Sequence, residues 1–294
     1  MKHLAARERR VGVRAESTEG RTPNKRTKRR KRGRPRALAA YAALVYVFLY
    51  APIAILVLFS FNRARQTAVW EGWTLDWYRS LAGDDLILAS VKNSLVVGLI
   101  STAIAVMIGT FVALALGRHR FRGEGATRAL LYLPVIIPEV VVGAALVTFF
   151  GVLAMRLSLL TVVVAHVVFC VSYVAIVVRA RLAGFDRSLE EAALDLGARP
   201  LATFLRVTLP LITPGIVAGA LLSFTISIDD YVITSFVAGV GATTLPLQIY
   251  SMLKVGVTPE VNAVSSLILL FTIVMITIAT RLQQQSPARR GEAP

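Results

Sequence analysis

The chain has 294 residues, of which 55% are hydrophobic and 17% charged, and its mean hydropathy is +0.65. Soluble domains hold roughly 25% charged residues, so this composition excludes a chain that folds wholly in water. Lys and Arg outnumber Asp and Glu by 33 to 17, a formal charge of +16, and the single cysteine, Cys170, excludes an intramolecular disulfide. We therefore expect a polytopic membrane protein whose charges are segregated from its apolar segments.

Residues 1–37 hold 15 of the 33 basic residues and no apolar core of the kind that a signal peptide needs. This composition predicts a disordered cytoplasmic extension. The segment Arg32-Gly33-Arg34-Pro35 resembles the core of an AT-hook, whereas a juxtamembrane anchor that contacts anionic lipid explains the same charges. We favour the anchor, because six apolar stretches follow it and no DNA-reading domain does. A translation start further along the chain is a third interpretation.

Six apolar stretches are long enough to cross a bilayer, since a spanning helix needs about 20 residues. They cover residues 38–60, 94–116, 129–151, 157–179, 211–237 and 261–280. Backbone polar groups in lipid must be satisfied within the segment, and the stretches are too long for barrel strands. The sequence therefore predicts an all-α domain of six transmembrane helices over residues 38–280, with the third and fourth stretches forming a tight hairpin.

The basic residues set the orientation of these helices. With both termini in the cytoplasm, 27 of the 33 basic residues lie on the inner side and 6 on the outer side, as the positive-inside rule requires. Residues 281–294 then form a cytoplasmic tail. Outside the first stretch lie Trp70, Trp73, Trp77 and Tyr78. Such rings favour the headgroup level, so we interpret them as an interfacial belt, with an aromatic carbohydrate or cation cage as the alternative.

The inner loop over residues 180–210 carries two short helical patterns. Ser188 followed by Glu191 is a capping-box pattern, which predicts a helix from Leu189 onward. Gly197 is placed to adopt the left-handed conformation that ends such a helix.

Two prolines define the second helix of this loop. Pro200 suits its first turn, and we expect Pro210 to close the unit before the fifth stretch. Local rules thus predict a helix–glycine–helix elbow, in which the small Ala192 and Ala193 allow another surface to approach closely.

The same loop resembles the EAA loop of ABC importer permeases. The pattern is Glu191-Ala192-Ala193, three residues, Gly197, nine residues, and Val207-Thr208-Leu209-Pro210, with Val207 in place of Ile as the single departure. Further segments resemble the spermidine/putrescine-type branch of that family: Trp73–Tyr78, Asn93–Leu95, Pro134–Glu139, Asp229–Thr234 and Thr244–Tyr250.

This resemblance implies a type I importer fold in the bacterial inner membrane. It also implies three kinds of partner: a second permease subunit, an ABC ATPase dimer and an extracytoplasmic solute-binding protein. The residues that it assigns to ATPase coupling are Glu191, Ala192, Ala193, Gly197, Leu209 and Pro210. The chain has no Gly-x-x-x-x-Gly-Lys-Ser/Thr sequence, the usual P-loop. We therefore expect no enzyme activity and no cofactor on this chain, with ATP bound by the partner ATPase.

Three acidic residues fall inside the apolar stretches: Glu139, Asp229 and Asp230. Ionisable groups in a span are costly without a partner or water, so each is a candidate for the substrate pathway. Glu139 lies near the middle of the third stretch and follows Pro134 and Pro138, which interrupt the helix hydrogen bonds and predict a distorted, water-lined segment. The aspartates lie near the outer end of the fifth stretch. These carboxylates would receive a small cationic solute, most simply a polyamine. In the alternative, Glu139 bonds a neighbouring helix, and the aspartates cap a helix end or hold the partner permease.

His166 and Cys170 lie in the fourth stretch, four residues apart. His166 is interpreted as a packing or hydrogen-bonding residue, and a metal pair with Cys170 lacks further ligands. Within the importer class, the solute could instead be an opine or an amino-acid-like compound. Outside it, a proton-coupled secondary carrier could use the three acids as a relay, but such carriers usually show internal repeats, which this sequence lacks.

Overall fold

The computed structural model describes residues 36–65, 69–118 and 121–284. The predictions made for residues 1–35 and 285–294, including the AT-hook-like segment, lie outside the described residues. Contacts divide the chain into two units, residues 1–49 and 50–294. The described part of the first unit, residues 36–49, belongs to a helix that continues into the second unit.

The described part of the chain is all-α, apart from one isolated antiparallel bridge between Asn62 and Trp73. Its helices are α1 (Arg36–Phe59), α2 (Asp76–Ala82), α3 (Asp85–Arg118), α4 (Glu124–Ile136), α5 (Glu139–Val152), α6 (Leu159–Ala183), α7 (Ser188–Asp195), α8 (Pro200–Thr203), the π-helical turn η1 (Phe204–Thr208), α9 (Leu209–Asp229), α10 (Val232–Val237), α11 (Leu245–Val255) and α12 (Pro259–Gln284).

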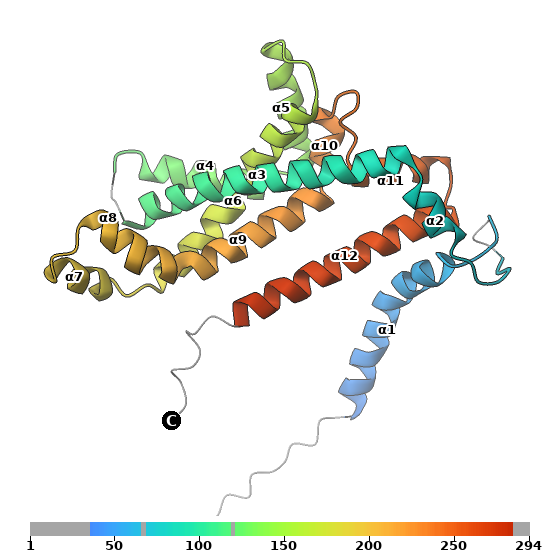
Figure 1. Ribbon diagram of the computed structural model, residues 1–294, viewed down its shortest axis with the longest axis horizontal. Helices are drawn as coiled ribbons and strands as arrows, with labels where there is room; N and C mark the ends of the chain where they lie inside the picture. Colours follow the sequence, from blue (N-terminus) through green and yellow to red (C-terminus); the bar gives the residue numbers. More distant parts are fainter. Residues whose placement is uncertain (1–35, 66–68, 119–120, 285–294) are drawn as a thin grey trace, which may run out of the picture. The chain divides into compact units, whose positions relative to one another are not determined.

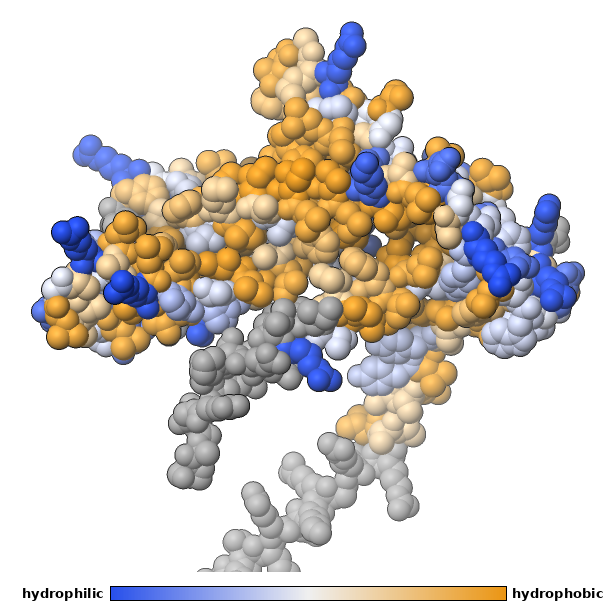
Figure 2. All heavy atoms as spheres, in the orientation of Figure 1, coloured by the Kyte–Doolittle hydropathy of each residue, from blue (hydrophilic) through white to orange (hydrophobic). Residues whose placement is uncertain are grey.

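Five helical segments are long and apolar enough to cross a membrane: Leu38–Phe59, Asp85–Arg118, Leu159–Ala183, Pro200–Asp229 and Pro259–Thr277. They correspond to five of the six predicted spans. Hydrophobic side chains cover the long helices on the face drawn in Figure 2, and hydrophilic residues gather toward the helix ends. A membrane-spanning helix needs this segregation, because its sides face lipid and its ends face water.

The packed centre is formed by α3, α6 and α9, which run side by side (Figure 1). A Cβ added at Gly109 of α3 would lie 2.9 Å from the Cβ of Val174, and one at Gly219 of α9 would lie 3.3 Å from the Cα of Val174. Val174 of α6 is fully buried between these two glycines. Small residues therefore let three backbones approach closely, which is how helices pack without a hydrophobic driving force between them.

The third predicted span is wrong as a single helix. Residues 124–152 form two helices, α4 and α5, bent from each other by 111°. Ile137 is extended, with φ −74° and ψ 136°, because the ring of Pro138 disfavours the helical conformation for the residue before it. Pro134, by contrast, lies inside α4. The distortion that the two prolines predict is thus a complete break, and Glu139, expected near the middle of the span, is the first residue of α5.

The fifth predicted span, residues 211–237, is also interrupted. Helix α9 ends at Asp229, Asp230 is extended with ψ 120°, and α10 begins at Val232. At its other end the helix begins earlier than predicted, because α8, η1 and α9 follow one another from Pro200 without a gap.

Two details of the predicted elbow are wrong as well. Ser188 is the first residue of α7 and makes no side-chain cap; the Oδ1 atom of Asp186 accepts the Ser188 N–H instead, at 3.0 Å. Pro210 does not close the unit, because it lies in the first turn of α9 directly after η1. Proline is tolerated there because the helix has already widened to the i→i+5 bonding of a π turn.

The predicted aromatic cluster has a polar centre. The Trp70 and Trp73 rings lie 5.0 Å apart, and Trp77 Nε1 donates to the backbone oxygen of the buried Asn62 at 2.8 Å. Trp73 remains 64% exposed. Its placement at a membrane interface stays a prediction.

Candidate functional site

Helix α7 ends in a glycine motif that fixes the angle of the elbow. Gly197 has φ +84°, the left-handed region that the sequence predicted. Its N–H donates to Leu194 O at 2.9 Å, and the Ala198 N–H donates to Ala193 O at 3.1 Å. This pair of bonds is a Schellman motif, which satisfies the last carbonyls of a helix. Arg199 is then extended and Pro200 opens α8, as predicted.

The beginning of α7 is fixed by a carboxylate outside the membrane spans. The hydrogen bond that Asp186 accepts from the Ser188 backbone holds the pKa of the Asp186 carboxyl below its usual range. The carboxylate therefore stays ionised at neutral pH and lies where the dipole of α7 favours negative charge.

The predicted coupling residues lie in this elbow and shortly after it. None of the eight described residues of α7 is buried, and Glu191 and Ala192 are exposed while Ala193 is partly covered. Leu209 and Pro210 are the first two residues of α9. Around them lie exposed leucines, namely Leu189, Leu194, Leu196, Leu201 and Leu205, and this exposed apolar surface is typical of an interaction site.

A neighbouring acid, Glu190, makes the contacts that sequence reasoning missed. Its carboxylate pairs with Arg118 at the end of α3 and accepts a hydrogen bond from Thr208 in η1. The only sequence signal was that Glu190 lies one helical position from Glu191, hence on another face of α7.

The two helix breaks meet at one cavity. Its volume is about 360 Å³, and all three predicted pathway acids, Glu139, Asp229 and Asp230, line it together with Tyr231. Glu139 and Asp229 are exposed, and neither forms an ion pair within the described ranges. Among the described residues that line this cavity, none is basic. The cavity therefore offers two free carboxylates beside a third.

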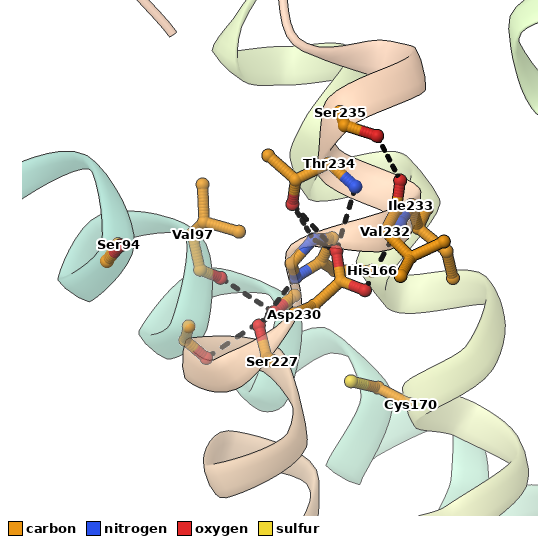
Figure 3. A network of polar contacts seen from close by, with 12 residues as sticks. Ser94, Val97, His166, Cys170, Ser227, Asp230, Val232, Ile233, Thr234 and Ser235 are labelled. Atoms are coloured by element: carbon orange, nitrogen blue, oxygen red, sulfur yellow. Dashed lines mark hydrogen bonds and ion pairs between the residues drawn. The ribbon is translucent and has the colours of Figure 1, made fainter. Parts of the chain in front are cut away.

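The third carboxylate, Asp230, is turned into a buried network (Figure 3). Its Oδ2 atom accepts the backbone N–H of Thr234 and the Thr234 hydroxyl, both at 2.8 Å, and its Oδ1 atom accepts the Ile233 N–H at 3.3 Å. Asp230 thus caps the first turn of α10. This is the helix-capping alternative for the aspartates, and it is observed at this residue.

His166 completes the network from α6. Its Nε2 atom lies 3.3 Å from Asp230 Oδ2 and 2.9 Å from Thr234 Oγ1, while Nδ1 lies 2.7 Å from Ser227 Oγ. The imidazole is fully buried. The interpretation of His166 as a hydrogen-bonding residue is confirmed. Within the described residues no group of three or more His, Cys, Asp or Glu side chains could hold a metal ion.

A larger apolar cavity of about 650 Å³ adjoins the first, and Asp229 and Tyr231 line both. The rings of Tyr231 and Tyr250 lie 4.3 Å apart, and Lys254 Nζ lies 5.0 Å from the centre of the Tyr250 ring. Aromatic faces of this kind attract cations. The Lys254 ammonium already lies over the Tyr250 ring, so a further cation that reaches Asp229 finds a carboxylate beside the Tyr231 ring.

Long apolar helices, an exposed elbow between two of them and a cavity at two helix breaks are typical of an integral membrane transport component. The family model described as "Binding-protein-dependent transport system inner membrane component" matches residues 105–290, and the chain belongs to this family. It is a multi-pass inner-membrane permease subunit of an ABC importer.

Among its relatives is the putrescine transport system permease protein PotI of Escherichia coli (strain K12). It is 45% identical over 233 residues, which cover 77% of this chain and 83% of the relative. The spermidine/putrescine transport system permease protein PotC of the same organism is 40% identical over 242 residues, or 82% of this chain and 91% of the relative. PotC of Haemophilus influenzae is 38% identical over 247 residues, which cover 84% of this chain and 96% of the relative.

Solved structures support the type I importer fold. A bacterial ABC transporter involved in the import of the acidic polysaccharide alginate matches with a TM-score of 0.63 at 17% identity, over 85% of this chain and 95% of that one. The MetNI methionine ABC transporter matches with a TM-score of 0.57 at 18% identity, over 72% and 98%. The predicted fold class is confirmed.

Proposed function

We propose that this permease carries a polyamine such as putrescine or spermidine across the inner membrane. The observation that supports it most is the cavity at the two helix breaks, where the carboxylates of Glu139, Asp229 and Asp230 gather without a basic residue among the described lining. A polyamine carries several positive charges at neutral pH, since alkyl amines titrate near 10.4 as lysine does. The names of the polyamine permeases to which the chain is similar point the same way.

The two aspartates have different tasks in this proposal. Asp229 and Glu139 are free to receive an ammonium group, with the Tyr231 ring beside Asp229. Asp230 uses its oxygens to cap α10 and to meet His166. Asp230 therefore holds the break open and adds negative charge to the cavity wall.

Energy and substrate come from partners of this chain. ATP is bound and hydrolysed by an ABC ATPase dimer, because the sequence holds no P-loop motif. The exposed elbow formed by α7, Gly197 and α8 docks on that ATPase. Glu191, Ala192 and Ala193 belong to the surface of the elbow. A solute-binding protein delivers the polyamine, and a second permease subunit completes the pathway.

Uptake by the reconstituted importer tests the proposal. We expect Glu139→Gln and Asp229→Asn each to reduce putrescine uptake strongly, because each removes a charge that meets the cation without changing the size of the side chain. Asp85→Asn is the matched control: Asp85 is an exposed acid in the first turn of α3, outside both cavities. Amount of complex and capture by the binding protein should be unchanged in all three variants.

Three results would contradict parts of this proposal. Parental uptake in both Glu139→Gln and Asp229→Asn would show that these acids are structural. Uptake of opine or amino-acid-like solutes but not of putrescine or spermidine would refute the polyamine assignment and leave the importer class intact. Uptake driven by a proton gradient without ATP would favour the secondary carrier.

A further inference from the structure

A partly buried polar cluster joins three elements at the base of the elbow. An Nη2 atom of Arg118, the last residue of α3, donates to Glu190 Oε1 and, at 3.2 Å, to Thr208 Oγ1. The Thr208 hydroxyl also donates to Glu190. Thr208 is fully buried, and the side chains of Arg118 and Glu190 are 26% and 19% exposed. Each member thus contacts the other two, and the members come from α3, α7 and η1.

A second contact supports the first. Arg187, which precedes α7, donates from Nη2 to the backbone oxygen of Gly117 at 2.8 Å. The last four carbonyls of a helix have no partner within it, so this bond satisfies one of them at the end of α3. Positive charge is also favoured there by the helix dipole. Both ends of the contact between α3 and α7 are therefore polar and specific.

Helix α7 depends on such polar contacts because it has no apolar anchor. None of its described residues is buried, and it packs on η1 and α8. Glu191 lies about 100° around the helix from Glu190, at 3.6 residues per turn, and is exposed. One face of α7 is thus free for a partner while the Glu190 face holds the helix to α3 and η1.

We propose that Arg118, Glu190 and Thr208 form the joint that transmits displacement of α7 to the membrane helices, with Glu190 as its positioning residue. Moving α7 away alone would break the ion pair between Arg118 and Glu190 and the hydrogen bond from the buried Thr208 hydroxyl to Glu190, which is unfavourable. Helix α3 therefore follows α7, and η1 carries the same movement into α9 through Thr208. This inference rests on the proposed function only in assuming that an ATPase displaces α7.

The test is the number of solute molecules taken up per ATP hydrolysed. It uses the full importer in liposomes, with Arg118→Gln, Glu190→Gln and the double variant in this chain. We expect co-purification of the ATPase to be unchanged. The number of solute molecules taken up per ATP should fall by roughly two- to thirtyfold, which corresponds to the coupling energies carried by residues between two sites. The double variant should be no worse than either single one, because both remove one interaction.

Glu124→Gln is the matched control. Glu124 pairs with Arg128 four residues on, within α4, so its loss removes a similar ion pair that joins no two elements. Its ratio should equal the parental one. If Glu190→Gln does not assemble, Arg118→Lys replaces it: lysine keeps the charge but has no planar fork to bond both partners, so a smaller fall in the ratio is expected.

A parental ratio in Glu190→Gln, or in Arg118→Lys where that variant is used, would overturn the joint. So would a loss of ATPase co-purification at an unchanged ratio, because Glu190 would then belong to the docking surface. The assay is run with whichever solute the parental importer takes up. A wrong polyamine assignment would therefore change the solute and leave the test of the joint intact.

Discussion

Replacement of Gly197 separates the geometry of the elbow from its chemistry. Gly197 has φ +84°, and a Cβ added to it would meet nothing within 4 Å. Within this chain, the backbone conformation and not a clash of the Cβ is therefore the expected cause of any effect. The two hydrogen bonds of the Schellman motif, from Gly197 and Ala198, depend on that conformation.

The magnitude follows from the backbone alone. A left-handed residue other than glycine costs about 1–2 kcal/mol, which lowers the ratio of correctly ended to otherwise ended α7 by a factor of roughly 5–30. Asparagine tolerates this conformation best and a β-branched residue least. We therefore expect retained uptake to fall in the order Gly197→Asn, Gly197→Ala, Gly197→Val, with Gly197→Val losing most of it.

Uptake and substrate-stimulated ATP hydrolysis are measured for the three variants in the reconstituted importer. Gly125→Ala is the control, because a Cβ at Gly125 in α4 also meets nothing within 4 Å but its φ is not left-handed. It should behave as the parent. Parental uptake in Gly197→Val, or equal loss in Gly197→Asn and Gly197→Val, would refute the reasoning from the left-handed turn.

Three shorter predictions concern other positions. His166→Ala should lower the melting temperature of the purified protein, because it removes the buried hydrogen bonds of the imidazole to Ser227 and Thr234, each worth about 0.5–1.5 kcal/mol; an unchanged melting temperature would contradict this. Gly239→Ala should abolish folded expression, since its Cβ would lie 1.8 Å from Leu157 O, whereas fluorescence-detected gel filtration should show Gly151→Ala, with open space, expressed normally. Asp186, whose pKa is lowered, stabilises α7 above the ordinary aspartate range, and this stabilisation is lost as pH falls through the folded-state value; the protection of α7 amides relative to their intrinsic exchange rates should fall on acidification, and Asp186→Asn should weaken that pH dependence.

Local sequence rules predicted the elements that depend on near neighbours. The left-handed Gly197, the helix opened by Pro200 and the long apolar helices all follow from residues within one or two turns. The capping box at Ser188 was wrong because Asp186, two residues earlier, competes for the same N–H. A pattern of residue types does not tell which of two acceptors lies closer.

The prolines predicted a distortion in the third span but not its position, and the break in the fifth span was not predicted. Pro134 and Pro138 both precede Glu139, yet α4 continues through Pro134 and stops before Pro138. The fifth break has no proline at all: Asp230 ends α9 because its carboxylate caps α10 and meets His166, 64 positions earlier in the chain. A contact between residues distant in the sequence determines that break, and hydropathy alone predicts one continuous helix there.

Helix α9 connects the two functional regions. It starts beside Thr208 of the proposed joint and ends at Asp229 on the cavity, and its 21 residues span roughly 30 Å at 1.5 Å each. Along this length, a Cβ on Gly215 would lie 2.7 Å from Arg181 Cβ, so α9 is held against α6 too closely to bend independently of it. We therefore expect α9 to move together with α6. Displacement at its first turn is therefore expected at its last, where the break at Asp230 lets α9 shift against α10 and change the position of the Asp229 carboxylate.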